Sequence, residues 1–173
     1  MNRRLAPLAV LVVLLLAGCV NYRLGSMLPA DIHTVHIPTC INQTDEPLIE
    51  QDVTRAIIAQ VQMDGSLRVV PEENADTELE VTLVKFWLDP VAYVSGDSAT
   101  ANQYRMSIRA AFVLRRLRDN TVVVESPGIT GWYEFDFAGD MTSSKAVALE
   151  PAADDLGRRI VNNIVQYWPK SPN

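Results

Sequence analysis

Histidine and cysteine are scarce in this chain, with two of each among 173 residues. His33 and His36 lie three apart on a predicted strand, and side chains alternate across a strand, so the two face opposite sides. They are therefore not expected to bind one metal ion. Cys19 ends an apolar N-terminal segment, and Cys40 ends an apolar stretch. We interpret Cys40 as a small buried hydrophobe with no disulfide partner in the monomer, with a reactive thiol as the alternative.

Catalytic motifs are also lacking, since the sequence has neither a GxSxG element nor a P-loop. The segment 142–145 only approximates an SxxK element, because threonine stands at its first position, and it is better explained as the start of a helix. Asp136 and Asp140 do not have the spacing of a calcium-binding loop. We therefore expect no catalytic residue, no metal site and no cofactor, and we predict that the protein is not an enzyme.

The chain has no long hydrophobic run and no excess of positive charge. Its longest apolar segment, 5–17, would reach only about 20 Å as a helix, short of the ~30 Å hydrocarbon core of a bilayer. Residues 1–18 hold two of the 15 basic residues and none of the 21 acidic ones, so the rest carries 13 basic and 21 acidic residues, a net charge of −8. Nucleic acid is therefore not an expected partner, because its binding depends on neutralising phosphates with Lys and Arg.

The N-terminus has the organisation of a secretory signal peptide. Arg3 and Arg4 precede the apolar segment, and Leu16-Ala17-Gly18-Cys19 closes it. These four residues resemble a bacterial lipobox, which predicts a signal peptide over 1–18, lipidation at Cys19 and a tether over 19–31. Val20 follows where an aspartate commonly retains lipoproteins in the inner membrane, so we expect an outer-membrane location facing the periplasm. The alternatives are an ordinary signal peptide with a coincidental cysteine, or an uncleaved short helix.

The first half of the remaining chain alternates between predicted strands and one helix. Residues 32–39 and 67–70 contain many β-branched side chains, which predicts a strand in each. The alternating segment 77–88 predicts a third strand, which we expect Asp89-Pro90 to end. Between the first two strands, a helix with Pro47 in its first turn is predicted to end at Gly65. Its apolar stripe recurs every four residues, at Ile49, Val53, Ile57 and Val61. Residues 95–102 are predicted to form a loop.

The second half is predicted to form a long hairpin and a helix. Strands over 104–117 and 122–135 flank a turn at 118–121, and Pro127-Gly128 marks a bulge. The helix has an apolar stripe, and Pro151 either opens it or lies inside a longer helix; the stripe comprises Leu149, Ala153, Leu156, Ile160 and Ile164. Residues 32–168 then form one α+β domain, a two-layer sandwich of a small mixed β-sheet with two amphipathic helices on one face, and 169–173 form a disordered tail.

The predicted sheet leaves one face open, and arginines of the long hairpin are expected to lie there or close to it. They are Arg105, Arg109, Arg115, Arg116 and Arg118, the one local excess of positive charge in an acidic protein. Guanidinium groups match phosphate and carboxylate geometry, so these residues form a candidate patch for a ligand or partner. The alternative is an ordinary solvated strand face.

Several segments occur in a characteristic order along the chain: the lipobox cysteine followed by 22–25, then 34–38 and 41–44, 64–70, 75–83, 104–106 and the C-terminal amphipathic helix. In the sequence and order of these segments, the chain resembles the LPS-assembly lipoprotein family, LptE. The resemblance implies a non-enzymatic lipoprotein that plugs the outer-membrane barrel LptD, assists its assembly and handles lipopolysaccharide. No lipopolysaccharide-contact residue can be transferred from it. Two other functions stay open: a lipoprotein activator of a peptidoglycan synthase, and an auxiliary lipoprotein of an ABC lipid-transport system.

Overall fold

The computed structural model describes residues 28–93 and 101–166. The predicted signal peptide, the lipidation site Cys19, most of the tether and the predicted tail 169–173 lie outside the described residues. So does most of the predicted loop 95–102.

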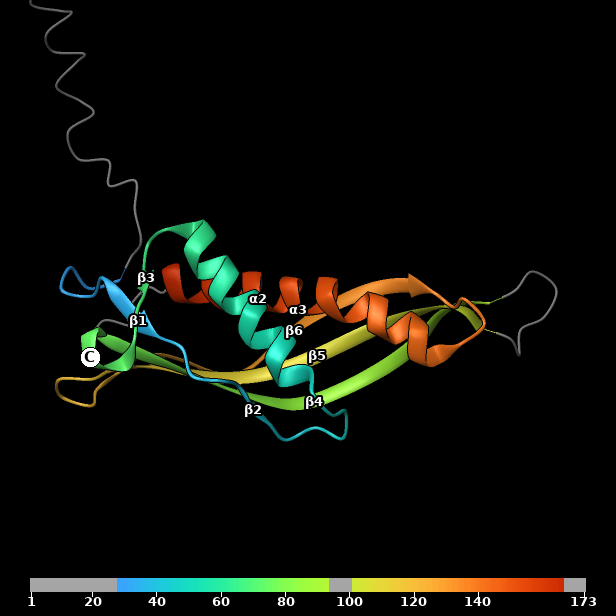
Figure 1. The fold of residues 1–173 in the computed structure, drawn as a ribbon, viewed down its shortest axis with the longest axis horizontal. Coiled ribbons are helices and arrows are strands. Elements are labelled where there is room, and N and C mark those ends of the chain that lie inside the picture. The colour runs from blue at the N-terminus through green and yellow to red at the C-terminus, as the bar shows by residue number, and fades with distance from the viewer. Residues whose placement is uncertain (1–27, 94–100, 167–173) are drawn as a thin grey trace, which may run out of the picture.

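A mixed sheet forms one layer of the molecule (Figure 1). Its strands are β1 (Thr34–His36), β2 (Ile41–Asn42), β3 (Arg68–Val69), β4 (Thr77–Tyr93), β5 (Ala101–Arg116) and β6 (Val122–Asp136). Their spatial order is β3-β1-β4-β5-β6, with β2 paired to β4. The short strands pair in parallel, whereas the three long strands β4, β5 and β6 form an antiparallel meander.

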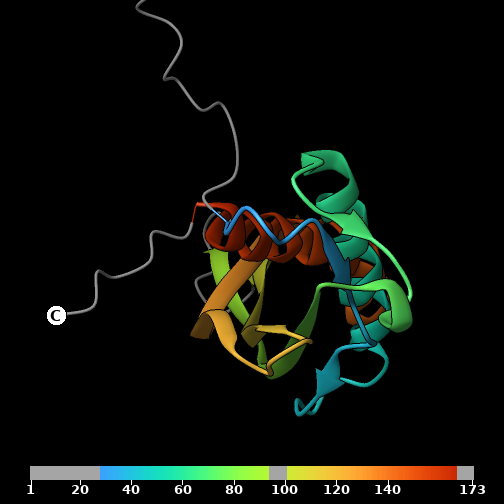
Figure 2. The ribbon, with the colours of Figure 1, turned by 90° about the vertical axis from the view of Figure 1, so that its left-hand side faces the viewer.

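Two helices form the second layer, and Figures 1 and 2 show both on the same side of the sheet. They are α2 (Ile49–Asp64) and α3 (Met141–Val165), and a 3-10 turn, η2 (Glu72–Asn74), lies between β3 and β4. The predicted α+β fold, with its mixed sheet and two helices, is confirmed. The predicted stripe of α2 is buried, and Gly65 ends this helix with φ 75°, the left-handed conformation that glycine adopts freely.

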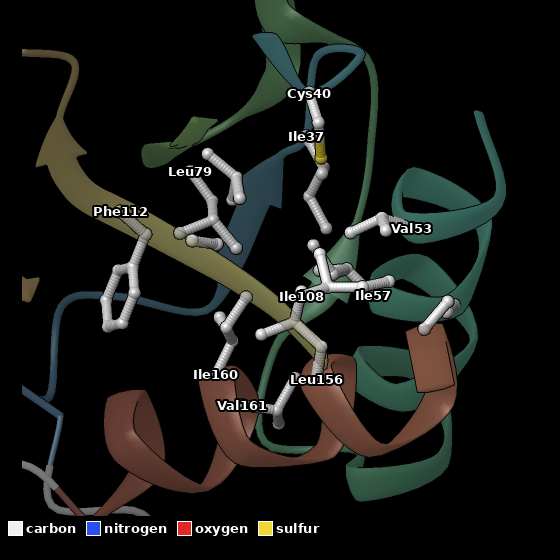
Figure 3. Packing of buried hydrophobic residues seen from close by; sticks show 14 of the residues in the cluster. Ile37, Cys40, Val53, Ile57, Leu79, Ile108, Phe112, Leu156, Ile160 and Val161 are labelled. Carbon is white, nitrogen blue, oxygen red and sulfur yellow. The ribbon is translucent and has the colours of Figure 1, made fainter. Parts of the chain in front are cut away.

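Both helices contribute to one hydrophobic core above the sheet (Figure 3). Ile57 of α2, Leu156 of α3 and Ile108 of β5 are each fully buried and lie together. Two glycines let α3 approach its neighbours closely. A Cβ at Gly131 of β6 would lie 2.4 Å from the Leu156 nitrogen, and one at Gly157 would lie 3.2 Å from the backbone of α2.

The structure decides the question that Pro151 left open. Pro151 lies inside α3, which begins well before it at Met141. Asp140 caps this helix by accepting a hydrogen bond from the Ser143 N–H at 2.8 Å, so the segment 142–145 is a helix start, as predicted. The helix tolerates the proline because its missing N–H is a single lost bond in a helix held by tertiary packing.

Several predicted boundaries were wrong. Of the strand predicted over 32–39, only Thr34–His36 is paired, and the short strand β2 follows after Pro38, outside the predicted range. Pro47 precedes its helix, which begins at Ile49 after Leu48 in a left-handed conformation. Residues 101 and 102, predicted as loop, are paired in β5.

Asp89-Pro90 does not break β4, which continues to Tyr93 with register shifts around Ala92. Beyond Leu83, no described strand pairs with β4 on the side opposite β5, so a proline can lack its N–H there without costing a ladder bond. The predicted bulge at Pro127-Gly128 is confirmed, because these two residues stand against one residue of β5.

Candidate functional site

The long meander gives the molecule a sheet face that neither α2 nor α3 covers. Side chains of β5 alternate as predicted: six lie toward the helices, namely Tyr104, Met106, Ile108, Ala110, Phe112 and Leu114. The intervening residues, beginning with Arg105 and Ser107, lie on the other face. We call this second face the open face.

Two tryptophans lie on either side of a serine on the open face, in the half that is remote from the turn between β5 and β6. Trp87 of β4 and Trp132 of β6 are both paired in register with Ser107 of β5. Ser107 is only 3 % exposed although it faces away from the core, whereas Trp132 is 41 % exposed. Large side chains directly opposite a small one in a sheet lie within contact distance and cover it, which accounts for this burial.

Charged side chains surround the two rings. The Lys85 ammonium lies 4.9 Å from the Trp87 ring centroid, and the Arg105 guanidinium lies 4.8 Å from that of Trp132. Each contact contributes about 0.5–1 kcal/mol at an exposed site. We call these four residues, with Ser107, the tryptophan array.

Acidic side chains hold the array in place. Arg105 donates to Glu134 Oε1 from Nη2 at 2.6 Å and from Nε at 3.1 Å, and Trp87 Nε1 donates to Asp89 at 2.7 Å. The bond from Trp87 is exposed and those from Arg105 are partly buried. Such bonds add little stability but orient the Trp87 ring and the Arg105 guanidinium. The array thus presents aromatic surface and cationic hydrogen-bond donors together, a combination that suits sugar rings, phosphates or a polar protein wall.

The five candidate arginines do not form one patch. Arg105 belongs to the array, and Arg109 lies next to it, with its guanidinium directly over Gly128 of the bulge. Arg115 is ten residues beyond Arg105 along β5, which corresponds to roughly 33 Å at the rise of a strand. The array end of the open face therefore keeps two of the five predicted arginines.

The remaining arginines gather at the tip of the hairpin, where acidic residues pair with Arg116 and Arg118. Arg116 and Arg118 both pair with Asp31, at 3.3 and 3.2 Å, and both also pair with Asp119. The pKa of Asp119 is lowered, chiefly by the Thr121 hydroxyl and also by these arginines. Arg115 donates to the Asn120 carbonyl at 3.4 Å. Two of the three arginines at this end are therefore paired with carboxylates.

An apolar groove of about 410 Å³ opens on the helix side, between the starts of α2 and α3. Phe86, Met106 and Leu149 contribute to its lining, and the Lys145 ammonium pairs with Glu46 and lies 5.7 Å from the Phe86 ring. Leu48, 68 % exposed, stands at the groove in the left-handed conformation. The sequence analysis missed this groove and both tryptophans. Side chains alternate along a strand, so the charged Glu134 two positions after Trp132 was the available signal that Trp132 lies on the open face.

The other side chains singled out from the sequence are those of one cysteine and two histidines. Cys40 is 4 % exposed, and burial raises the pKa of its thiol, which agrees with the predicted role as a small hydrophobe. His33 and His36 do not share a metal-ligating cluster among the described residues. No helix within 28–93 or 101–166 has the length and apolar character needed to cross a membrane.

Comparison with known proteins was informative at the level of family and fold. The family model LptE, described as lipopolysaccharide-assembly, matches residues 32–164. A search of curated protein sequences found no match to this chain. Among solved structures, a protein from Xanthomonas campestris is 13 % identical with a TM-score of 0.56, and 80 % of this chain covers 87 % of it.

Two bacterial lipoproteins have the same fold. A putative lipoprotein from Caulobacter crescentus is 12 % identical with a TM-score of 0.51, over 76 % of this chain and 87 % of its own. A minor lipoprotein from Acinetobacter baumannii is 11 % identical with a TM-score of 0.52, over 79 % and 93 %. At these identities the likeness is one of fold alone.

Proposed function

Because this chain belongs to the lipopolysaccharide-assembly family LptE, we propose that it is an outer-membrane lipoprotein that occupies the lumen of the LptD barrel and assists lipopolysaccharide assembly there. The family match carries the proposal, since it spans 32–164, nearly the whole described domain. LptE is a family of non-enzymatic outer-membrane lipoproteins. Lipidation at Cys19 would anchor the chain, because several acyl chains together bind a membrane stably where one does not.

The open face is the surface that we assign to the barrel wall and to lipopolysaccharide. Arg105 and Arg109 of this face would donate to phosphate or carboxylate groups, for which guanidinium geometry is suited. Arg115, Arg116 and Arg118 would contribute at the hairpin tip, where a partner anion would have to replace Asp31 or Asp119 to reach Arg116 or Arg118. Exchange of one carboxylate for another anion is nearly balanced in energy, and it would also be needed at Arg105, which pairs with Glu134. We therefore expect Arg109, which has no ion-pair partner among the described residues, to contribute most at the array end.

The apolar groove between the starts of α2 and α3 suits a hydrocarbon chain. Its mainly apolar lining and its volume of about 410 Å³ would admit part of a hydrocarbon chain. The Glu46–Lys145 pair would lie beside the polar end of such a chain. Lipopolysaccharide provides both the hydrocarbon for the groove and the phosphates for the arginines.

The proposal is tested by purifying the full chain from outer membranes in mild detergent and identifying what accompanies it by mass spectrometry. We expect an LptD barrel and lipopolysaccharide. Replacing Arg105, Arg109 and Arg115 together by Ala should lower their recovery at least about tenfold, since each lost hydrogen bond to a charged group costs about 1.5–3 kcal/mol.

The matched control is Arg55→Ala, which removes an exposed arginine of α2 paired at 3.1 Å with Asp52, away from the open face. It should leave recovery unchanged and should unfold at the wild-type temperature, because exposed substitutions cost under about 0.5 kcal/mol. The triple variant loses the contacts of Arg105 with Trp132 and Glu134, so a small decrease in its unfolding temperature is expected, and recovery is compared where both variants are fully folded. Recovery of a peptidoglycan synthase, or of an ABC transport component, without the barrel would contradict the proposal.

A further inference from the structure

Three metal-ligating side chains meet on the sheet beside its first strand. They are His36 of β1, Glu72 of η2 and Glu78 of β4, and a ligand atom of each lies within 4.8 Å of the others. The pairing of β1 with β4 places His36 directly opposite Glu78, and η2 brings Glu72 to them. We propose that these three residues form a Zn²⁺ site, which is independent of the function proposed above.

None of the three side chains has a hydrogen-bond or ion-pair partner among the described residues. This is unexpected for Glu78, because Arg115 of β5 is its direct cross-strand neighbour, yet Arg115 donates to Asn120 instead. Two carboxylates this close repel each other unless a cation lies between them. The unpartnered imidazole and carboxylates are therefore available as ligands for a cation.

The donor set favours zinc over the alkaline-earth cations. Zn²⁺ binds imidazole nitrogen and carboxylate oxygen at about 2.0–2.2 Å, whereas Ca²⁺ and Mg²⁺ take oxygen ligands almost exclusively. Tetrahedral bonds of that length place ligand atoms about 3.3 Å apart. The ligand atoms of the three side chains lie up to 4.8 Å apart, and rotation of the exposed Glu72 side chain would shorten its distances to the other two. Three protein ligands leave one position open to solvent or to a further ligand.

A zinc ion at this site would add a cross-link between three segments that Thr34 already joins by hydrogen bonds with Asn74, Asp76 and Thr77. β1 pairs with β4 through only two residues, and η2 has three residues. The ion would hold both against the long strand β4 where the described chain enters the sheet. Since the ion binds the folded chain only, it would also raise the unfolding temperature with increasing Zn²⁺ concentration.

The test uses the full chain, purified in detergent through a tag without histidine, stripped with a chelator, and titrated with ZnCl₂ in a calorimeter. We expect one Zn²⁺ per chain and an upward shift of the unfolding temperature. His36→Gln and Glu78→Gln should each weaken binding at least about tenfold. Co²⁺ should bind with the intense visible absorption of a tetrahedral site.

The control variants replace neighbours of the same chemical type, as His33→Gln and Glu73→Gln, and should bind Zn²⁺ as the wild type does. All four variants should unfold at the wild-type temperature in the absence of metal, which separates loss of a ligand from loss of the fold. Equal Zn²⁺ affinity of the wild type and His36→Gln would overturn the proposal. So would Ca²⁺ binding as tight as that of Zn²⁺, because it would indicate a purely acidic cation site.

Discussion

At the scale of single residues, Gly128 and Gly131 of β6 lie three positions apart in opposite environments. A Cβ at Gly131 would meet the backbone of Leu156 at 2.4–2.5 Å, and that backbone belongs to a packed helix. A Cβ at Gly128 would meet the Arg109 guanidinium at 2.5 Å, the far end of a flexible, exposed side chain. The two glycines are therefore required for different reasons, one for helix packing and the other for the position of an arginine.

We expect Gly131→Ala to lower the free energy of unfolding by about 1–3 kcal/mol or more, because α3 must shift away from the sheet. Gly128→Ala should change it by less than about 0.5 kcal/mol, since Arg109 can rotate aside. Urea unfolding of the two purified variants measures both values. Equal destabilisation by the two substitutions would show that α3 does not pack on Gly131 as described.

At the scale of elements, Asp155 connects α3 to the edge strand β6. It is 9 % exposed and accepts a hydrogen bond from the Trp132 N–H at 3.0 Å and one from Arg159 at 2.6 Å, and it also pairs with Arg158. A helix side chain thus satisfies a backbone donor that β6 would otherwise present to other chains at the sheet edge. Burial raises the pKa of Asp155, but the hydrogen bonds from Arg159, Trp132 and Arg158 outweigh burial and leave it below its ordinary value.

A lowered pKa makes the contribution of Asp155 to stability depend on pH. This contribution is fully present above the unfolded pKa of about 3.9 and is lost as pH falls through the lower folded value. At pH 7 we expect Asp155→Asn to cost about 1–3 kcal/mol, since it removes a charged acceptor from nearly buried donors.

Denaturant unfolding between pH 7 and pH 2.5 measures this dependence. The stabilities of the wild type and Asp155→Asn should begin to converge below about pH 4 and should be closest at the lowest pH, where the folded wild-type carboxylate becomes protonated. A difference in stability that stays constant down to pH 2.5 would contradict the role of the charge.

At the scale of the whole molecule, the two helices share one core with the sheet, so neither is expected to unfold alone. Ile57 of α2 and Ile160 of α3 are both 0 % exposed. Replacing either by Asp buries an unpaired charge and should cost more than about 4 kcal/mol, a large part of a total of about 5–15 kcal/mol.

Thermal unfolding followed by circular dichroism tests this expectation. Ile57→Asp and Ile160→Asp should each lower the midpoint of one cooperative transition. The control variants Ala59→Asp and Asn163→Asp place the same residue on exposed positions of the same helices and should have small effects. A separate early transition in either core variant would show that the helices unfold independently.

The sequence by itself determined the parts of this protein that depend on local periodicity. The four-residue stripe of α2 and the alternation along β5 were both visible in the chain, because each secondary structure repeats its buried face at its own period. Gly65 and the bulge at Pro127-Gly128 were equally predictable, since both depend on backbone preferences of single residues. The family resemblance was also visible in the sequence, because it rests on short segments that follow one another in a fixed order.

Only the tertiary structure decided which distant residues meet. Asp89-Pro90 was expected to break β4, and it does not, because β4 is unpaired on its second side at that point. Five arginines close in sequence divide between two ends of the sheet, since a strand separates residues by about 3.3 Å each. Strand register places Trp87 and Trp132 on either side of Ser107. It also sets His36 opposite Glu78, and η2 brings Glu72 to them. No local sequence pattern encodes strand register.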